Sequence, residues 1–240
     1  MKKFLKKILP YRVKNKISNI KGLYFAKFKD FYWSQEGEDI ILRRIFEYKE
    51  KGFYIDVGAY HPYRFSNTYY FYRRGWYGIN IDANPEGIKQ FQKFRPRDIN
   101  LNFAIGLRKG KMRYFMFNEP ALNTFDENLA KERDGFQNFK IIKTIELEIL
   151  TLKEVLDRYM PLGQEIDFMN VDVEGMDYEV LQSNDWNKFR PHILLVEIIP
   201  ARTIEEVLNS EINVFLKSID YRLFAKCFNT CIFKAEEFRL

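Results

Sequence analysis

Phe53-Tyr-Ile-Asp-Val-Gly-Ala-Tyr-His-Pro62 is the most informative stretch of this 240-residue sequence. Its first five residues are aromatic or β-branched apart from Asp56, which is typical of a buried parallel strand. The small residues Gly58 and Ala59 follow, and small side chains let a ligand approach the backbone. We therefore expect a strand that ends at a ligand-binding turn.

A second apolar run, Trp76-Tyr-Gly-Ile-Asn-Ile81, follows after a segment of helical length and ends at Asp82. A strand, a small-residue turn, a helix and a strand closed by an acid form the layout of a nucleotide-binding βαβ unit. In such a unit the second acid accepts hydrogen bonds from the ribose hydroxyls. The turn lacks the full G-x-G-x-x-G, so this interpretation depends on the paired acids, Asp56 and Asp82.

Apolar or alternating runs predict further strands, with helical segments between most of them. These predicted strands span 99–105, 111–117, 141–149, 166–171, 192–196, 221–226 and 230–234. The run at 111–117 is expected to form a hairpin ribbon with 99–105. Alternating helices and strands with two strands at the end predict a doubly wound α/β sheet whose final pair is antiparallel.

Two segments beside this predicted sheet invite a functional interpretation. A helix is expected to begin with Ser34 as its N-cap and Gly37 inside it. The polar residues at its start reflect either helix-start preference or a contact of Gln35 with the amino-acid end of a cofactor. Residues 118–140 lack a clean periodicity and predict a long loop containing a helix, of the kind that commonly holds substrate.

The net charge of +6 is unevenly distributed. Residues 1–30 hold ten Lys or Arg and one Asp, a net +9 that leaves −3 for the remainder. Apolar residues recur there every three to five positions, which predicts a basic amphipathic arm over 1–32 and a separate domain over 33–240. The arm either binds an anionic membrane surface or acidic partner, or packs on the domain. Because the domain is mildly acidic, no nucleic-acid partner is expected.

Three features favour a cytoplasmic location. No apolar run approaches the roughly 20 residues of a membrane span. Lysines interrupt the N-terminal apolar runs too often for a signal peptide. The only two cysteines, Cys227 and Cys231, do not make a disulfide framework and fit a reducing compartment. If the arm binds lipid, the protein would lie peripherally on the inner membrane face.

Acidic residues follow four of the predicted core strands, and ligands of open α/β sheets bind beyond the carboxyl ends of the strands. Asp56 and Asp82 fall on the nucleotide half of the sheet. Asp172, Glu174 and Glu197 fall on the other half, where an acceptor is expected. A single such acid is often just a helix cap or loop residue, but four strand ends at one rim predict a ligand site.

Five motifs in order resemble the FkbM family of S-adenosylmethionine-dependent methyltransferases over residues 33–200: SQEGED, DVGAYHP, SNTYYFYRRGWYGINIDANP, NFAIG and IDFMNVDVEGMDYEVL. The resemblance implies a class I methyltransferase fold, which is Rossmann-like with a seven-stranded doubly wound sheet. It also implies O-methylation of a hydroxyl on a sugar or other small metabolite, with surface-polysaccharide biosynthesis as one setting.

The same resemblance implies roles for individual residues. The methionine part of the cofactor would lie against Asp56, Gly58 and Ala59, with Gln35 nearby. The ribose would lie at Asp82 and its neighbour Ala83, and the adenine beside Asn102 and Phe103. Apart from the resemblance, Asn67 and the strand-end residue Glu197 are candidates to contact the acceptor, a small molecule or glycan.

Methyl transfer from a sulfonium mainly requires that the acceptor oxygen is held in position and that a base removes its proton. Asp172 and Glu174 are the leading base candidates, followed by His61, whose ordinary pKa suits proton transfer near neutrality. A metal is not expected, although Asp172, Glu174 and Glu197 offer oxygen ligands that suit Mg²⁺. With only two histidines and no His/Cys spacing, zinc is not supported.

Other functional classes compete with this interpretation. A nucleotide-cofactor oxidoreductase would want a fuller glycine fingerprint. A non-catalytic membrane-surface adaptor on a methyltransferase fold would leave the acid-lined rim without purpose. An RNA methyltransferase would usually present an Asn/Asp-Pro-Pro-aromatic stretch where this chain has Asp172-Val-Glu-Gly175.

Overall fold

The computed structural model describes residues 31–199 and 201–240. The chain divides into two compact units, Met1–Tyr32 and Trp33–Leu240. The predicted basic arm over 1–30 lies outside the described residues. No helix among the described residues is both long enough and apolar enough to cross a bilayer.

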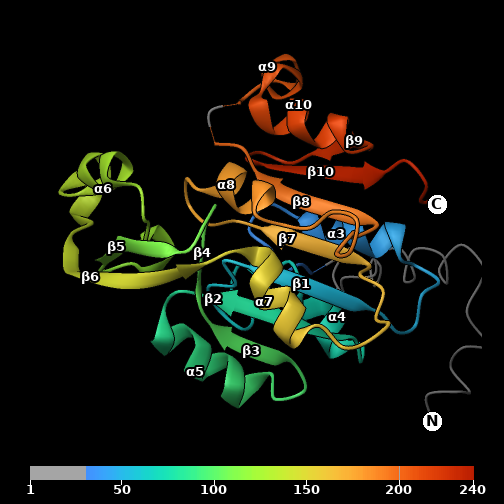
Figure 1. Cartoon of the computed structure of the whole chain (residues 1–240), viewed down its shortest axis with the longest axis horizontal. Helices are drawn as coiled ribbons and strands as arrows, with labels where there is room; N and C mark the ends of the chain where they lie inside the picture. Colours follow the sequence, from blue (N-terminus) through green and yellow to red (C-terminus); the bar gives the residue numbers. More distant parts are fainter. Residues whose placement is uncertain (1–30, 200) are drawn as a thin grey trace, which may run out of the picture. The chain divides into compact units, whose positions relative to one another are not determined.

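A seven-stranded mixed sheet forms the centre of the second unit (Figure 1). Its strands, in spatial order, are β3 (Ile99–Asn102), β2 (Tyr77–Asp82), β1 (Phe53–Val57), β7 (Phe168–Val171), β8 (Ile193–Glu197), β10 (Thr230–Ala235) and β9 (Tyr221–Lys226). The first five are parallel, whereas β10 runs antiparallel to both β8 and β9. The prediction of an α/β fold with a seven-stranded sheet is confirmed.

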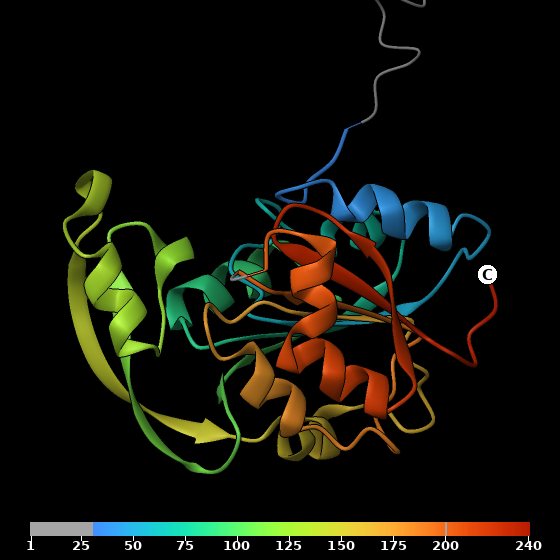
Figure 2. The same ribbon diagram turned by 90° about the horizontal axis from the view of Figure 1, so that it is seen from above.

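Helices cover both faces of this sheet (Figure 2). On one face lie α3 (Glu38–Ile45) and α4 (Tyr69–Arg73); on the other lie α7 (Leu152–Tyr159), α8 (Asp177–Gln182) and α10 (Glu211–Ser218). Two more helices, α5 (Pro85–Phe94) and α9 (Ile204–Asn209), follow β2 and β8.

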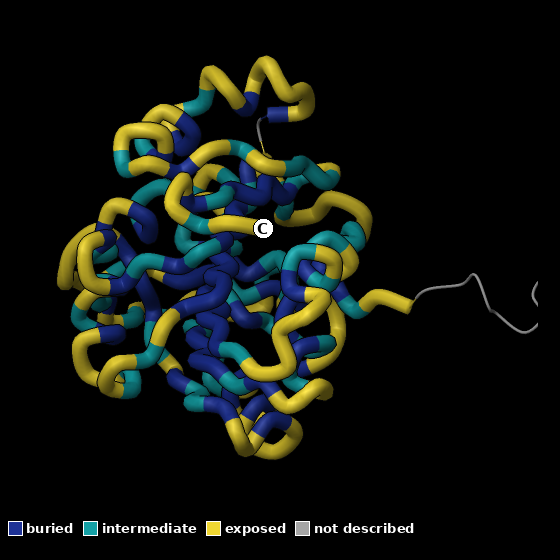
Figure 3. The backbone as a smooth tube through the Cα atoms, turned by 90° about the vertical axis from the view of Figure 1, so that its right-hand side faces the viewer, coloured by how far each residue is buried: buried dark blue, intermediate teal, exposed yellow. Residues whose placement is uncertain are grey.

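Strand alternation explains how the core divides between the two faces. In β1, Phe53, Ile55 and Val57 pack with the α7, α8 and α10 face, while Tyr54 packs with the α3 and α4 face. Every residue of β1 is therefore buried, as a central parallel strand requires. Figure 3 shows the buried residues, in dark blue, gathered toward the inside of this unit, with most of the exposed residues, in yellow, around them.

The predicted hairpin between 99–105 and 111–117 is wrong. Instead, β5 (Gly110–Phe117) pairs antiparallel with β6 (Ile141–Leu150), in a separate sheet of order β4-β6-β5. Ala104–Ile105 belongs to this sheet as β4, parallel to β6. The predicted strand 99–105 is divided between the two sheets: β3 pairs with β2 in the main sheet, and from Ala104 the chain enters the second sheet, where β6 is the partner of β5.

Residues 118–140 contain a helix, as predicted. Besides α6 (Glu127–Arg133), the segment holds the short 3₁₀ turns η1 (Pro120–Leu122) and η2 (Phe136–Asn138). The Asp126 side chain caps α6 by accepting from two backbone N–H groups. Ala130 of α6 is buried against the second sheet, which therefore has its own small core.

The start of α3 differs from the prediction. Its N-cap is Gly37, with φ of 90°, and Ser34 lies three residues earlier. The Ser34 hydroxyl accepts from the Gly37 N–H at 3.1 Å and donates to Asp39 at 2.7 Å. Ser34 thus closes the turn before the helix, and Gly37 supplies the left-handed conformation that this turn needs.

Candidate active site

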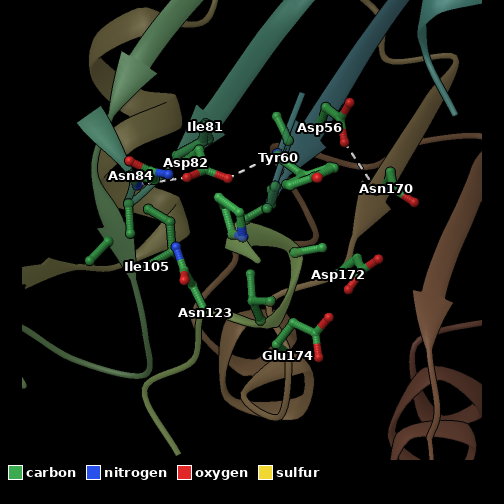
Figure 4. A pocket seen from close by; sticks show the side chains of 18 of the residues that line it. Asp56, Tyr60, Ile81, Asp82, Asn84, Ile105, Asn123, Asn170, Asp172 and Glu174 are labelled. Atoms are coloured by element: carbon green, nitrogen blue, oxygen red, sulfur yellow. Dashed lines mark hydrogen bonds between the residues drawn. The ribbon is translucent and has the colours of Figure 1, made fainter. Parts of the chain in front are cut away.

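A cavity lies beyond the carboxyl ends of β1, β2 and β7, and the second sheet and residues 120–125 form its opposite wall. Figure 4 shows Asp82 on one side of this space and Asp172 and Glu174 on the other. Ten predicted site residues line it: Gln35, Asp56, Gly58, Ala59, Asn67, Asp82, Ala83, Phe103, Asp172 and Glu174. The strand-end argument therefore found the acidic residues that line the cavity, Asp56, Asp82, Asp172 and Glu174.

Three predicted residues do not line this cavity. His61 uses Nδ1 to accept from the N–H groups of Tyr63 and Arg64, at 3.3 and 3.2 Å, so it stabilises its own turn. Burial and the nearby Arg64 charge lower the pKa of His61. Asn102 donates to the backbone carbonyls of Asp82 and Ala83 at 2.9 and 3.0 Å. Glu197 lies behind Asp172, in a neighbouring cavity under α9.

Gly58 is required by the backbone path around the cavity. Its φ is 80°, and a Cβ there would lie 1.7 Å from the Asp172 carbonyl oxygen. The N–H groups of Gly58 and Ala59 both donate to the Ile81 carbonyl, at 2.9 and 3.1 Å. One glycine is sufficient for this turn because Tyr60 also adopts a left-handed conformation, with φ of 46°.

Asp82 holds the turn and faces the cavity. Its two carboxylate oxygens accept from the N–H groups of Asn84 at 2.6 Å and Tyr60 at 2.9 Å. Burial raises the pKa of Asp82 to about 6, against these two hydrogen bonds, which lower it. Each oxygen of an ionised carboxylate has a further lone pair. Asp82 can therefore also accept from ligand hydroxyl groups.

Asp56 of β1 is part of a buried polar network. Its oxygens accept from the Thr68 hydroxyl at 2.8 Å and the Asn170 amide at 3.0 Å. The fully buried Arg95 donates to Thr68 at 2.9 Å and to Asp98 at 2.8 Å. Burial raises the pKa of Asp56, and the Arg95 charge opposes that rise. This network fixes the cavity floor in one geometry.

Asn67 brings an unused acceptor to the cavity. Its amide nitrogen donates to Asn170 at 2.9 Å, while its Oδ1 is buried without a hydrogen-bond partner. The residue is 8% exposed and lines the cavity. Since buried polar atoms are nearly always paired, a ligand N–H or O–H group is the natural partner of Asn67 Oδ1.

On the far side, three carboxylates crowd together. Asp172, Glu174 and Glu197 each offer an oxygen, and these oxygens lie within 4.8 Å of one another. Burial, followed by the charges of Glu197 and Glu174, raises the pKa of Asp172 well above its ordinary value. Burial and the Glu174 charge raise the pKa of Glu197 to about 8. Such a cluster can take a proton from a hydroxyl, or once ionised supply oxygen ligands to a hard divalent cation.

Arg133 of α6 restrains one of the three acids. It donates to Glu174 at 2.6 Å, and the Thr124 hydroxyl donates to the Glu174 carbonyl oxygen at 2.6 Å. On the other side of the cavity, the Tyr60 hydroxyl donates to Glu119 at 2.9 Å. These contacts tie the second sheet's connections to the turns of the main sheet.

Sequence reasoning missed four further cavity residues: Tyr114 of β5, Asn123 and Phe125 of the connection that follows β5, and Asn170 of β7. The rings of Tyr114 and Phe125 lie 4.6 Å apart. No sequence pattern identifies Tyr114, Asn123 or Phe125 as site residues. They line the cavity together with residues of β1 and β2 only because of how the second sheet lies against the main sheet. Asn170 lay inside a quoted motif, but no role was predicted for it.

A parallel sheet with an acid-lined cavity at its carboxyl edge is the arrangement of α/β proteins that bind nucleotide-like cofactors. The family model described as Methyltransferase FkbM domain matches residues 56–223 of the chain. The chain therefore belongs to the FkbM methyltransferase family, and the resemblance found in the sequence is confirmed. A comparison with curated proteins finds no match.

Proposed function

We propose that the protein is an S-adenosylmethionine-dependent O-methyltransferase of class I, Rossmann-like architecture. The observation that carries the proposal is the cavity at the carboxyl edge of β1, β2 and β7, with Asp82 on one side and the Asp172 cluster on the other. The strand order supports it, because the first βαβ unit lies at the centre of the sheet with β7 beside it.

The nucleotide half of the cavity fits the proposed cofactor. Asp82 would accept from the ribose hydroxyls, beside Ala83, and Phe103 would border the adenine. The unpaired Oδ1 of Asn67 and the amide of Gln35 lie toward the amino-acid end, where an ammonium group needs acceptors. Asn67 is thereby moved from the acceptor, where the sequence placed it, to the cofactor.

When bound, S-adenosylmethionine supplies an electrophilic methyl group. The chain's own contribution is to hold the acceptor oxygen in line at about 3 Å and to remove its proton. Asp172 is the proposed base because it lines the cavity and, unlike Glu174, forms no ion pair with Arg133. Glu197, the third acid of the cluster, does not line this cavity. Glu197 keeps the cluster's proton affinity high through its charge.

The acceptor is proposed to be a hydroxyl of a sugar or other small metabolite, a glycan included. The site needs no metal for this chemistry, and nucleic acid is not proposed as a partner. A cytoplasmic location fits this proposal. A nucleotide-cofactor oxidoreductase would use the same cavity, but the cluster of Asp172, Glu174 and Glu197 would have no role in its reaction.

Titration calorimetry separates these functions. We expect saturable binding of S-adenosylmethionine and no binding of NAD, because the cavity offers acceptors for the ammonium group and one ribose. Methyl transfer from labelled cofactor to a panel of sugars and hydroxylated metabolites then tests catalysis. Binding of NAD in preference to S-adenosylmethionine would overturn the proposal.

A further inference from the structure

A series of aromatic rings runs across the molecular surface beside α4. Measured between ring centroids, Tyr63 lies 6.0 Å from Tyr69, Tyr69 lies 5.6 Å from Trp33, and Trp33 lies 6.2 Å from Tyr70. Tyr63 also contacts Phe94 at 5.9 Å. We refer to these five residues, with the cations that cover them, as the α4 surface.

The α4 surface begins at the mouth of the cavity. Tyr60 and Phe65 line the cavity, and their rings lie 6.3 Å apart. His61 joins the two regions, because its ring lies 5.9 Å from Tyr60 and 4.5 Å from Tyr63. Whatever binds the α4 surface is therefore held next to the entrance of the candidate active site.

Exposed cations cover the rings. Arg73 lies 5.2 Å over Trp33, Arg74 lies 5.7 Å over Tyr70, and Lys93 lies 5.2 Å over Phe94. Among the described residues, no carboxylate forms an ion pair with any of these three cations. The sequence from 57 to 81 contains no Asp or Glu at all. The segment that carries α4 is thus positive. The carboxylate that contacts Trp33, Asp39, is buried and accepts from the Trp33 backbone N–H at 3.2 Å.

This combination fits an anionic lipid interface. Tyr and Trp prefer the interface because they have an apolar body and a polar end, and anionic headgroups attract nearby Lys and Arg. Tyr63 and Phe94 remain 43% and 47% exposed, which leaves apolar area for the outer part of a bilayer. In sequence, Trp33 lies three residues beyond the +9 segment 1–30, in which apolar residues recur among the lysines.

We propose that the α4 surface docks on the anionic phospholipid surface of a membrane and holds the cavity mouth beside the headgroups. A soluble polyanion would satisfy the cations but would give the rings and the N-terminal apolar residues no apolar phase. The proposal concerns the folded domain itself, and it does not depend on which molecule is methylated.

Vesicle co-sedimentation of the full chain tests it. The variant Arg73→Glu/Arg74→Glu is compared with Lys140→Glu/Lys143→Glu, which makes the same charge change at exposed positions beside the second sheet. On phosphatidylcholine vesicles containing phosphatidylglycerol, the first variant should bind about 30-fold more weakly than the unmodified chain. The control variant should lose much less, and added salt should narrow the difference.

The apolar part is tested by Phe94→Ser against Phe228→Ser, a residue 78% exposed on the β9–β10 turn. Phe94→Ser should weaken vesicle binding at high salt, and Phe228→Ser should not. Equal losses in both charge variants, or full binding by Arg73→Glu/Arg74→Glu, would overturn the proposal. Binding to a soluble acidic polysaccharide as tight as binding to the vesicles would also overturn it. Thermal melting of each variant checks that it is folded.

Discussion

At the scale of single residues, the acids at the strand ends differ in how much of their bonding capacity the protein already uses. Asp82 accepts from two backbone N–H groups and Asp56 from two side chains. Asn67 Oδ1 and Glu197 Oε2 are buried and have no partner. Ligand contacts should therefore be energetically most sensitive at the atoms that the protein leaves unpaired.

The cofactor side is tested at Asp82. Asp82→Ala removes the proposed ribose acceptor, so binding of S-adenosylmethionine should weaken by about 1–3 kcal/mol. Calorimetry measures the loss. Because Asp82 also holds Tyr60 and Asn84, a matched control is Asn102→Ala, which loosens the same turn from outside the cavity. An equal loss in both variants would mean that turn order, and not a ligand bond, explains the effect.

The acceptor side is tested at Asp172. Asp172→Asn keeps the shape of the side chain but removes its basicity, so turnover should fall by about 10²-fold or more. Cofactor affinity should barely change, because Asp172 and Asp82 lie on opposite sides of the cavity. If turnover survives and cofactor binding collapses, Asp172 belongs to the cofactor pocket. If both survive, Glu174 becomes the leading base.

The pH profile of turnover tests the coupling of Asp172 to Glu197. Because burial and the Glu197 charge raise the pKa of Asp172, activity should rise with pH as the base loses its proton, well above the ordinary range of a carboxyl group. Glu197→Gln removes that charge, so the rise should move to lower pH. Initial rates of both forms between pH 5 and 9 measure this shift. An unmoved profile would exclude the Asp172–Glu197 pair as the titrating unit.

At the scale of elements, local sequence predicted each strand better than it predicted strand pairing. β1 was found at its observed bounds because five consecutive core residues leave little ambiguity. The pairing of β5 was wrong because register and partner depend on β6, which lies more than twenty residues further along the chain. His61 was predicted as a base from its ordinary pKa, and Asn102 was assigned to the adenine by the family resemblance. In the structure, backbone groups of neighbouring turns take up both side chains.

The turn after β1 depends on Gly58, and substitution tests how strictly this position requires glycine. Gly58→Ala would place a Cβ 1.7 Å from the Asp172 carbonyl oxygen at a φ of 80°. Gly163→Ala has a φ of 71° but meets no atom within 4 Å. We expect Gly163→Ala to cost about 1 kcal/mol from backbone strain alone and Gly58→Ala several times more, with loss of cofactor binding. Thermal melting and calorimetry measure both. Similar costs would show that the close approach at Gly58 relaxes easily.

At the scale of the whole molecule, the candidate site depends on two sheets. The strand ends of the main sheet supply Asp82 and Asp172, and the second sheet supplies Tyr114 of β5 and Asn123 of the connection after it. The acids could be predicted because carboxyl ends of parallel strands meet at one edge by topology alone. The opposite wall could not, since no local pattern states where the second sheet folds back.

The buried acids also give the whole molecule a distinctive pH dependence. Burial raises the pKa of Asp82 to about 6, of Asp177 to about 7 and of Glu197 to about 8. An acid whose folded pKa is raised binds more protons in the folded state than in the unfolded state. The free energy of unfolding therefore falls as pH rises from about 4, the unfolded pKa range, through the folded values. His61, whose folded pKa is lowered, acts in the opposite direction up to its ordinary pKa.

Glu197→Gln should therefore flatten the decline of unfolding free energy between about pH 5 and 8, by up to roughly 1.4 kcal/mol per pH unit. Glu237→Gln is the matched control, because its ion pair with Arg190 lowers the pKa of Glu237 to about 2. Its contribution is present above about pH 4.5 and is lost as pH falls toward 2, so the control should change only the acidic limb. Urea unfolding across both ranges measures each variant. If the two variants change the unfolding free energy over the same pH range, Glu197 is ionised in the folded protein at neutral pH. The cluster of Asp172, Glu174 and Glu197 then holds no proton between its members.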